Sequence, residues 1–245
     1  MCRRVLCFLK VGMEKTTKSL RGYFTKAEIV LWCASVGLII ASFCVFDRSE
    51  YMTLAASLIG VTSLPLNAKG NPLGQLLTII FSIFYGIISF TFAYYGEMIT
   101  YLGLTAPMAV FALVMWLRHP YNGKRSEVTV NHIGKNEAII MLLLSATVTA
   151  VFYFILAAFR TANIIPSTLS VTTSFLAVHL TARRREFFPL AYAANDIVLI
   201  ILWTPAAMAD ISYISVVICF VTFLANDIYG FISRSHMKKR QSAGK

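Results

Sequence analysis

The sequence predicts an all-α integral membrane protein of about eight transmembrane helices: two parallel three-helix bundles joined by one helix, plus an extra N-terminal helix. Three observations indicate this fold class, namely an apolar composition, regularly spaced uncharged stretches and a faint internal repeat. Of the 245 residues, 58% are hydrophobic and only 13% are charged, and the mean hydropathy is +0.70. A soluble domain of this length is far less apolar.

Eight stretches with few or no charges account for the predicted transmembrane helices. Each is close to the roughly 20 residues that cross about 30 Å of hydrocarbon as a helix. The shortest, 51–68, contains Pro65, a residue that disturbs helices, near its end. Six stretches lack Asp, Glu, Lys and Arg, and two contain a single Asp: 29–46, 51–68, 70–96, 98–117, 138–159 and 161–182, followed by 187–209 and 211–233.

The basic residues predict a multi-pass protein of the cell (inner) membrane with both termini in the cytoplasm. Lys and Arg are enriched in the cytoplasmic loops of membrane proteins. The net charge of +11 then reflects topology and attraction to anionic membrane lipids, so no nucleic-acid partner is expected. Of the 22 Lys and Arg residues, only Arg48 and Arg160 lie outside the segments 1–27, 67–72, 118–137, 183–186 and 234–245.

An internal repeat predicts the domain organisation. When the chain is shifted on itself by about 115 residues, "YMTLAASLIGVTS" matches "PSTLSVTTSFLA" and the helix pairs that follow correspond. One helix between two three-helix units makes the units parallel, as in transporters with a site between their halves. The predicted division is a basic cytoplasmic N-terminus (1–28), an extra transmembrane helix (29–46), a first repeat (51–117), a cytoplasmic loop (118–137), a linker helix (138–159), a second repeat (163–233) and a basic cytoplasmic tail (234–245).

Three predicted helices carry polar side chains at helical spacing, which places them on one face. Small polar residues of this kind also line ordinary helix–helix contacts in membranes. For Ser and Thr, a role in the substrate site and a role in helix contacts therefore both stay open. The polar faces are Gln75, Thr78, Ser82, Tyr85 and Ser89 in the first helix, Tyr192, Asp196 and Trp203 in the second, and Ser215, Cys219, Thr222, Asn226, Tyr229 and Ser233 in the last.

The tetrad Ala-Asn-Asp-Ile occurs twice, at 194–197 and 225–228, each time inside an apolar stretch. Ionisable residues within a membrane span usually face a cavity or a partner. Both tetrads lie about 10 Å from the cytoplasmic end of their helices, at roughly 1.5 Å per residue, so they can meet. Asn195 and Asn226 are predicted to bind substrate or to join helices. Because adjacent residues point about 100° apart, Asn226 is assigned to substrate and Asp227 to structural anchoring.

The sequence does not predict an enzyme, a cofactor or a metal site. The five cysteines and four histidines show no paired spacing of metal ligands, and no Gly-rich phosphate loop or nucleophile elbow is present. A transporter is therefore favoured. A membrane-embedded scaffold, in which the polar faces only hold helices together, is the alternative from another class.

Four motifs occur in order along the chain: Tyr-Gly-Glu-Met at 95–98, Met-Trp-x-x-His at 115–119, "RRREFFPLAYAAND" and Asn-x-Ile-Tyr-Gly at 226–230. With them, about residues 50–235 resemble the Pnu vitamin transporter family, most closely its nicotinamide riboside branch. The resemblance implies a fold similar to SWEET sugar transporters and transport by facilitated diffusion. It also implies trapping of the substrate by a cytoplasmic kinase, and a homotrimer.

The predicted function is uptake of nicotinamide riboside. Tyr85, Tyr192 and Trp203 would bound its cationic ring, which gains about 1–2 kcal/mol from aromatic faces when desolvated. The phosphorylated nucleotide is not expected as substrate, because the polar faces contain no Lys or Arg to neutralise a phosphate. The predicted substrate-binding residues are Gln75, Ser82, Tyr85, Tyr192, Asn195, Trp203, Asn226 and Tyr229, with Asp196 and Asp227 as structural or gating residues.

Three positions depart from the family pattern. Ala109 stands where members often have Gln, and Phe188 and Ala191 stand where they often have Trp. Thiamine or another nucleoside-like vitamin is therefore an alternative substrate. A proton-coupled carrier that uses Asp196 or Asp227 is an alternative mechanism.

Overall fold

A computed structural model describes residues 22–91, 94–132, 134–161 and 163–243. The predicted N-terminal segment 1–28 therefore falls largely outside the described residues. The elements are the helices α2 (Lys26–Phe46), α3 (Tyr51–Ala68), α4 (Pro72–Thr91), α5 (Tyr95–Ile99), a π-helix (Thr100–Thr105), α6 (Ala106–Arg118), the strands β1 (Pro120–Tyr121) and β2 (Lys124–Val128), and the helices α7 (Lys135–Ala158), α8 (Ile164–Ala182), α9 (Phe188–Ala209), a 3₁₀ turn (Ile211–Tyr213) and α10 (Ile214–Ala243).

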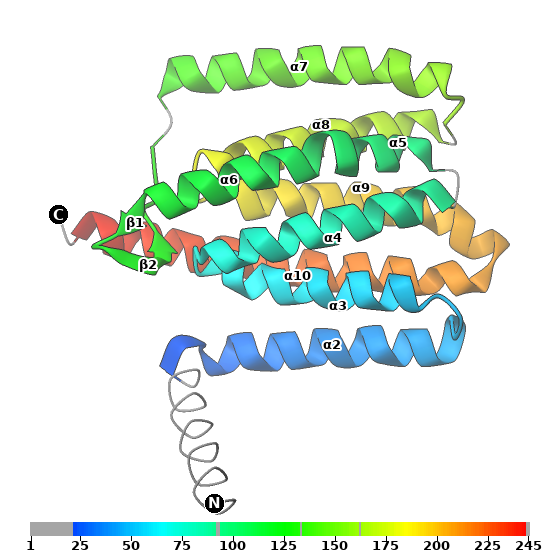
Figure 1. The fold of residues 1–245 in the computed structure, drawn as a ribbon, viewed down its shortest axis with the longest axis horizontal. Coiled ribbons are helices and arrows are strands. Elements are labelled where there is room, and N and C mark those ends of the chain that lie inside the picture. Colours follow the sequence, from blue (N-terminus) through cyan, green and yellow to red (C-terminus); the bar gives the residue numbers. More distant parts are fainter. Residues whose placement is uncertain (1–21, 92–93, 133, 162, 244–245) are drawn as a thin grey trace, which may run out of the picture.

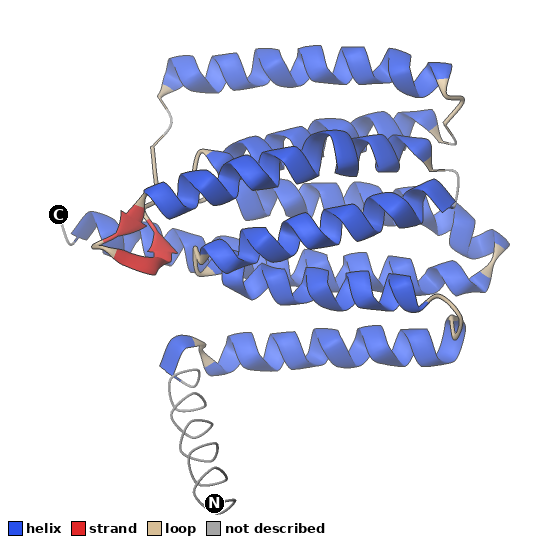
Figure 2. Ribbon diagram, viewed as in Figure 1, coloured by secondary structure: helices blue, strands red, loops and turns tan. Residues whose placement is uncertain are grey.

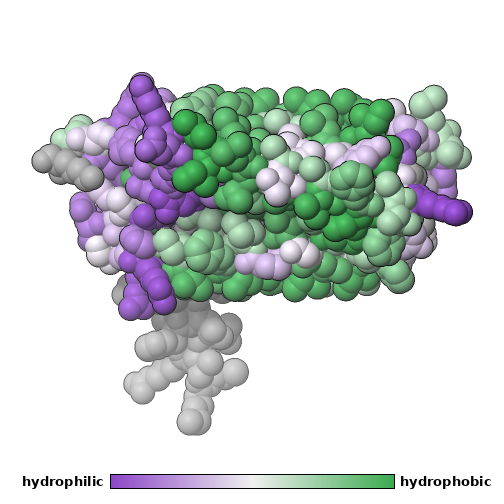
Figure 3. Space-filling view, turned by 90° about the horizontal axis from the view of Figure 1, so that it is seen from above, coloured by the Kyte–Doolittle hydropathy of each residue, from purple (hydrophilic) through white to green (hydrophobic). Residues whose placement is uncertain are grey.

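The fold is that of an all-helical membrane protein, with strands only in a short hairpin at one end (Figure 2). Within the described ranges, seven helices are long and apolar enough to cross a membrane, with α5, the π-helix and α6 counted as one. The eighth predicted span, α3, is not among the seven. It carries Asn67 and several hydroxyl side chains on a buried face. Figure 3 shows a broad hydrophobic band between two more hydrophilic ends.

Six helices of the described chain form a closed ring, in the order α3, α4, α6, α8, α9, α10 and back to α3. α2 lies outside the ring against α3 and α10, and α7 lies outside it against α8 (Figure 1). The first half of the ring (α3, α4 and α5–α6) therefore contacts the second half (α8, α9 and α10) along two seams. One seam is α5–α6 with α8, and the other is α10 with α3.

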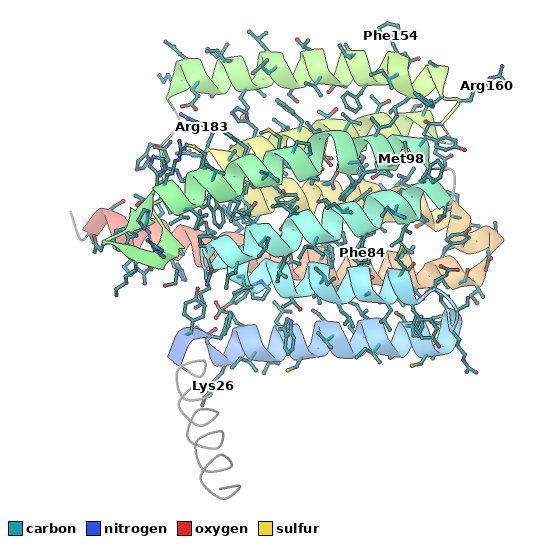
Figure 4. All side chains as sticks on the ribbon, viewed as in Figure 1. Lys26, Phe84, Met98, Phe154, Arg160 and Arg183 are labelled. Atoms are coloured by element: carbon teal, nitrogen blue, oxygen red, sulfur yellow. The ribbon has the colours of Figure 1, made fainter. Side chains whose placement is uncertain are left out.

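The hairpin β1–β2 closes one end of the ring. Val128 of β2 donates its backbone N–H to the carbonyl of Gly70 at 3.0 Å. Gly70 adopts a left-handed φ of +71°, and a Cβ there would lie 2.6 Å from an Arg234 nitrogen. This turn therefore requires glycine for its backbone and for its close packing. Lys26 and Arg183 lie towards this same end, whereas Arg160 lies at the opposite end (Figure 4).

Helix α10 continues through most of the segment predicted as a basic tail, 234–245. Arg234 is fully buried, and its guanidinium lies 5.4 Å from the ring centre of Trp116 and 5.1 Å from that of Phe188. Gln241 accepts from the Val130 N–H at 2.8 Å and donates to the Val128 carbonyl at 3.1 Å. These contacts with the hairpin hold the extension as a helix, although its sequence is too charged for a membrane span.

Candidate functional site

An aromatic cluster fills the centre of the ring. Trp203 of α9 donates its indole N–H to the hydroxyl of Tyr85 on α4 at 2.7 Å, so two predicted site residues from opposite halves meet directly. Tyr101 of the π-helix lies 4.4 Å from Tyr85 between ring centres, and Tyr94 lies 4.5 Å from Trp203. All four rings are buried. Flat aromatic faces and a few hydroxyl groups are what a ring-shaped ligand requires.

Asn195 makes a polar bridge beside these rings. Its side-chain oxygen accepts hydrogen bonds from Thr173 at 2.8 Å and Ser174 at 3.0 Å, both on α8. Its side chain also lies near the Tyr101 hydroxyl. Tyr101 belongs to the first half of the ring and Asn195 to the second. A ligand that separates the halves would therefore find both groups at their interface.

Glu97 is a buried polar residue that was not among the site residues predicted from the sequence. Its side chain is fully buried in α5, and Oε1 accepts a hydrogen bond from Ser170 of α8 at 2.8 Å. Oε2 has no hydrogen-bond partner among the described residues. The available signal was a single carboxylate between the uncharged stretches 70–96 and 98–117. That position suggested an exposed turn between two spans, but α5 begins at Tyr95 and brings Glu97 inside.

The two Asn-Asp tetrads meet through their aspartates. Asp196 of α9 and Asp227 of α10 are both buried, and their carboxyl groups lie close enough to interact electrostatically. The second oxygen of Asp196, Oδ2, has no hydrogen-bond partner within the part of the chain that the structure describes.

Gln75, Ser82 and Tyr192 lie in other parts of the ring. Gln75 donates to Asn67 of α3 at 2.8 Å, and its Oε1 has no partner among the described groups. Ser82 donates to the carbonyl of Thr78 within its own helix at 2.7 Å. Tyr192 packs edge-on against Phe188, with ring centres 6.3 Å apart. The structure does not join these three to the Tyr85–Trp203 pair through any hydrogen bond that it describes.

Asn226 and Tyr229 face the peripheral helix α2. Asn226 donates to the Ser35 hydroxyl at 2.8 Å, and the Tyr229 hydroxyl lies 3.2 Å from that of Thr25, the N-cap residue of α2. On the same face of α10, Ser215 approaches the carbonyl of Ser42 at 3.5 Å. This polar face therefore joins α10 to α2, as the helix-contact interpretation expected of its small residues.

A small cavity beside the aromatic cluster has a volume of about 10 Å³, close to the space one water molecule needs. Ligand pockets for small molecules are typically ~300 Å³ or larger. A ligand of nucleoside size would therefore have to displace the rings. The cavity is lined by Thr53, Ala56, Ser57, Phe81, Tyr85, Ile88, Val216, Cys219 and Phe220.

No metal centre is found within the described residues, which contain no group of three or more His, Cys, Asp or Glu placed to hold an ion. The site is instead a layer of rings and isolated polar groups between two helical units. Such an arrangement can bind and release a small molecule, and it offers no evident nucleophile and base pair for covalent chemistry.

Comparison with known proteins gives three matches. Residues 50–235 match the model of the family described as nicotinamide mononucleotide transporter. A protein of Neisseria mucosa named nicotinamide riboside transporter PnuC is 26% identical over 230 residues, covering 92% of this chain and 87% of that protein. The crystal structure of the vitamin B3 transporter PnuC superposes with a TM-score of 0.79 at 23% identity, covering 92% of this chain and 97% of that one. The last match shows a shared fold.

Proposed function

Because the chain belongs to the nicotinamide mononucleotide transporter family, we propose that it carries nicotinamide riboside across the membrane by facilitated diffusion. Membership of a transporter family places the chain outside the enzymes. The observation that carries the choice of site is the Trp203–Tyr85 hydrogen bond, which joins α9 to α4 across the ring at 2.7 Å. The named relative from Neisseria mucosa supports the riboside as substrate.

The two halves of the ring act as parallel three-helix units that rock against each other within an eight-span protein. When they separate, the rings of Tyr85, Tyr101 and Trp203 bound the pyridinium, and each aromatic face contributes about 1–2 kcal/mol to a desolvated cation. Asn195 then binds the ribose or the carboxamide. Gln75, whose Oε1 is buried without a partner among the described residues, is the second amide available to the substrate. Ser82 and Tyr192 line the rest of the proposed substrate path between the two halves.

Asn226 and Tyr229 have a different role in this proposal. Their contacts with Ser35 and Thr25 commit them to α2, so they hold the peripheral helix against the ring. The prediction that Asn226 binds substrate stays a prediction, but its amide would have to leave Ser35 to do so.

The riboside is preferred to the mononucleotide because the proposed binding residues include no Lys or Arg. The buried arginine of the described chain, Arg234, lies against the rings of Trp116 and Phe188 at the end closed by the hairpin. A phosphate group would enter without a countercharge, which is unfavourable in a dry site. Proteoliposomes should therefore show saturable uptake of labelled nicotinamide riboside and at least tenfold slower uptake of its mononucleotide. Equal uptake of both would contradict this assignment.

Both termini are proposed to lie in the cytoplasm, where a kinase would trap the imported riboside by phosphorylation. The clustering of basic residues supports this orientation. A reporter fused after Lys245 should be active only as a cytoplasmic reporter, and periplasmic activity would exclude the topology. A homotrimer is proposed from the family resemblance and is tested by the mass of the detergent-solubilised protein.

A second candidate mechanism is proton coupling through the Asp196–Asp227 pair, which the closeness of the two buried carboxyl groups favours. A coupled carrier would concentrate its substrate inside vesicles that contain no kinase when the inside is made alkaline. Facilitated diffusion would only equilibrate it. Because Ala109, Phe188 and Ala191 depart from the family pattern, the same vesicles should be tested for competition by thiamine and other nucleosides.

A further inference from the structure

We infer that the carboxylate of Glu97 interacts with the positively charged ring of the substrate and so makes the transporter selective for cationic over uncharged nucleosides. The inference rests on the proposed function, because it concerns what the same site selects. It adds a residue that lies outside the polar faces on which the predicted site was built.

The burial of Glu97 is the first argument. Glutamate is almost never fully buried unless it is paired, and buried polar groups nearly always have hydrogen-bond partners. Glu97 is fully buried and has one partner, Ser170, with Oε2 left without a partner among the described residues. This oxygen is therefore available to a ligand.

The absence of a countercharge is the second argument. The glutamates Glu28, Glu127, Glu137 and Glu186 each form an ion pair with Lys or Arg near the end that the hairpin closes. For Glu97, no Lys or Arg of the described chain lies within ion-pair distance. A buried carboxylate without a cation is strongly unfavourable, and a bound cation would offset part of that penalty.

The surroundings of Glu97 are the third argument. Its carboxyl group lies close enough to the hydroxyls of Tyr85, Tyr94 and Tyr101 to interact with them electrostatically. Two of these rings bound the proposed substrate site, and Tyr94 packs on Trp203. Aromatic faces and a carboxylate attract the same kind of ligand, a flat cation. The pyridinium ring of nicotinamide riboside carries a fixed positive charge at every pH.

The placement of Glu97 between the halves is the fourth argument. Its hydrogen bond to Ser170 joins α5 of the first half to α8 of the second. When the halves separate, this bond is lost and both carboxylate oxygens become available. A protonated Glu97 could serve only as a link between helices, so the test must distinguish a charge effect from a structural one.

The test compares nicotinamide riboside with its reduced 1,4-dihydropyridine form, which has the same ribose and carboxamide but no charge. Wild-type protein in proteoliposomes should take up the oxidised form with a kcat/KM at least ~10-fold higher. Glu97→Gln should lower kcat/KM for the oxidised form by about 10-fold, equivalent to ~1.4 kcal/mol, and leave the reduced form unchanged. Ser170→Ala is the matched control, since it removes the hydrogen bond but keeps the carboxylate and should keep the preference.

Each outcome of this test either supports or overturns the role of Glu97 in charge selectivity. Equal loss of both forms in Glu97→Gln, or a preference as large as that of the wild type, would overturn the role of Glu97 while uptake by the wild type upheld the proposed function. Equal uptake of the two forms by the wild type would overturn it without any variant. If the wild type imports neither form, the proposed function fails and the inference fails with it.

Discussion

The two Ala-Asn-Asp-Ile tetrads are identical in sequence, yet the fold gives their asparagines opposite surroundings. Asn195 accepts hydrogen bonds from Thr173 and Ser174 of α8 and lies beside Tyr101, at the interface of the two halves. Asn226 instead donates to Ser35 of α2, outside the ring. The aspartates converge, since the buried carboxyl groups of Asp196 and Asp227 lie close to each other between α9 and α10.

The difference shows that a motif fixes spacing along a helix but not the direction in which the helix faces. α9 and α10 run in opposite directions and have different outer neighbours. Among the described elements, α10 is covered by α2, whereas α9 has no long outer helix packed against it to a similar extent. In the proposed function one asparagine therefore binds substrate and the other joins α10 to α2, and mutations should separate these roles.

Asn195→Ala should have the largest effect on transport. The substitution removes the acceptor for two hydroxyl groups and a proposed substrate ligand, and the loss of such a buried partner costs about 1–3 kcal/mol. Uptake of nicotinamide riboside per folded transporter should fall by roughly 10- to 100-fold. Initial rates in proteoliposomes, normalised to monodisperse protein, measure this. Uptake close to the wild-type rate would remove Asn195 from the site.

Asp227→Ala should mainly lower stability. It leaves Asp196 buried without its carboxyl partner, at about 1–3 kcal/mol, so the melting temperature and the yield of folded protein should fall. Substrate binding by the surviving protein should change little. Asp227→Asn is the control, because its amide can donate to Asp196 and should restore most of the stability. A stable Asp227→Ala protein that no longer binds substrate would instead place this aspartate in the transport step.

Asn226→Ala should produce a smaller loss of stability, about 1 kcal/mol, with uptake per folded molecule retained. The lost interaction is a hydrogen bond between neutral groups at a helix contact, not an acid pair. Ser35→Ala removes the other partner of the same bond and should have a similar effect. A double variant no worse than either single one would show that both act through one contact. Lost binding with unchanged stability would restore Asn226 to the substrate site.

Tyr229→Phe should have the smallest effect. Its hydroxyl meets Thr25 at an exposed position, where substitutions usually change stability by no more than about 0.5 kcal/mol. Both the melting temperature and uptake should stay within error of the wild type. A clear fall in uptake would indicate that this face of α10 does more than hold α2.

The fold could be predicted from sequence to a large extent because a segment that crosses hydrocarbon must be a long helix with few charges. The eight apolar stretches correspond to α2, α3, α4, α5–α6, α7, α8, α9 and α10. The sequence did not show that α10 continues beyond the apolar stretch 211–233 to Ala243. The extension is held by tertiary contacts, namely the hydrogen bonds of Gln241 with Val128 and Val130 and the Lys238–Glu186 ion pair.

The site was predictable only in part. Helical spacing correctly groups residues on one face, and it brought Tyr85 and Trp203 into the same prediction. Spacing does not show which neighbour that face meets, so the faces of Asn195 and Asn226 could not be distinguished. Glu97 was missed for a related reason, since the sequence gives no sign that the turn at 95–98 is folded inside the ring.

The position of α7 has a consequence for the chain as a whole. This helix carries the connection between the halves but lies outside the ring, where it packs against α8. The two seams therefore join the halves through contacts that do not involve α7. Two separate polypeptides, cut between residues 132 and 135 and made in the same cell, would carry complementary helix faces and could assemble into a working transporter.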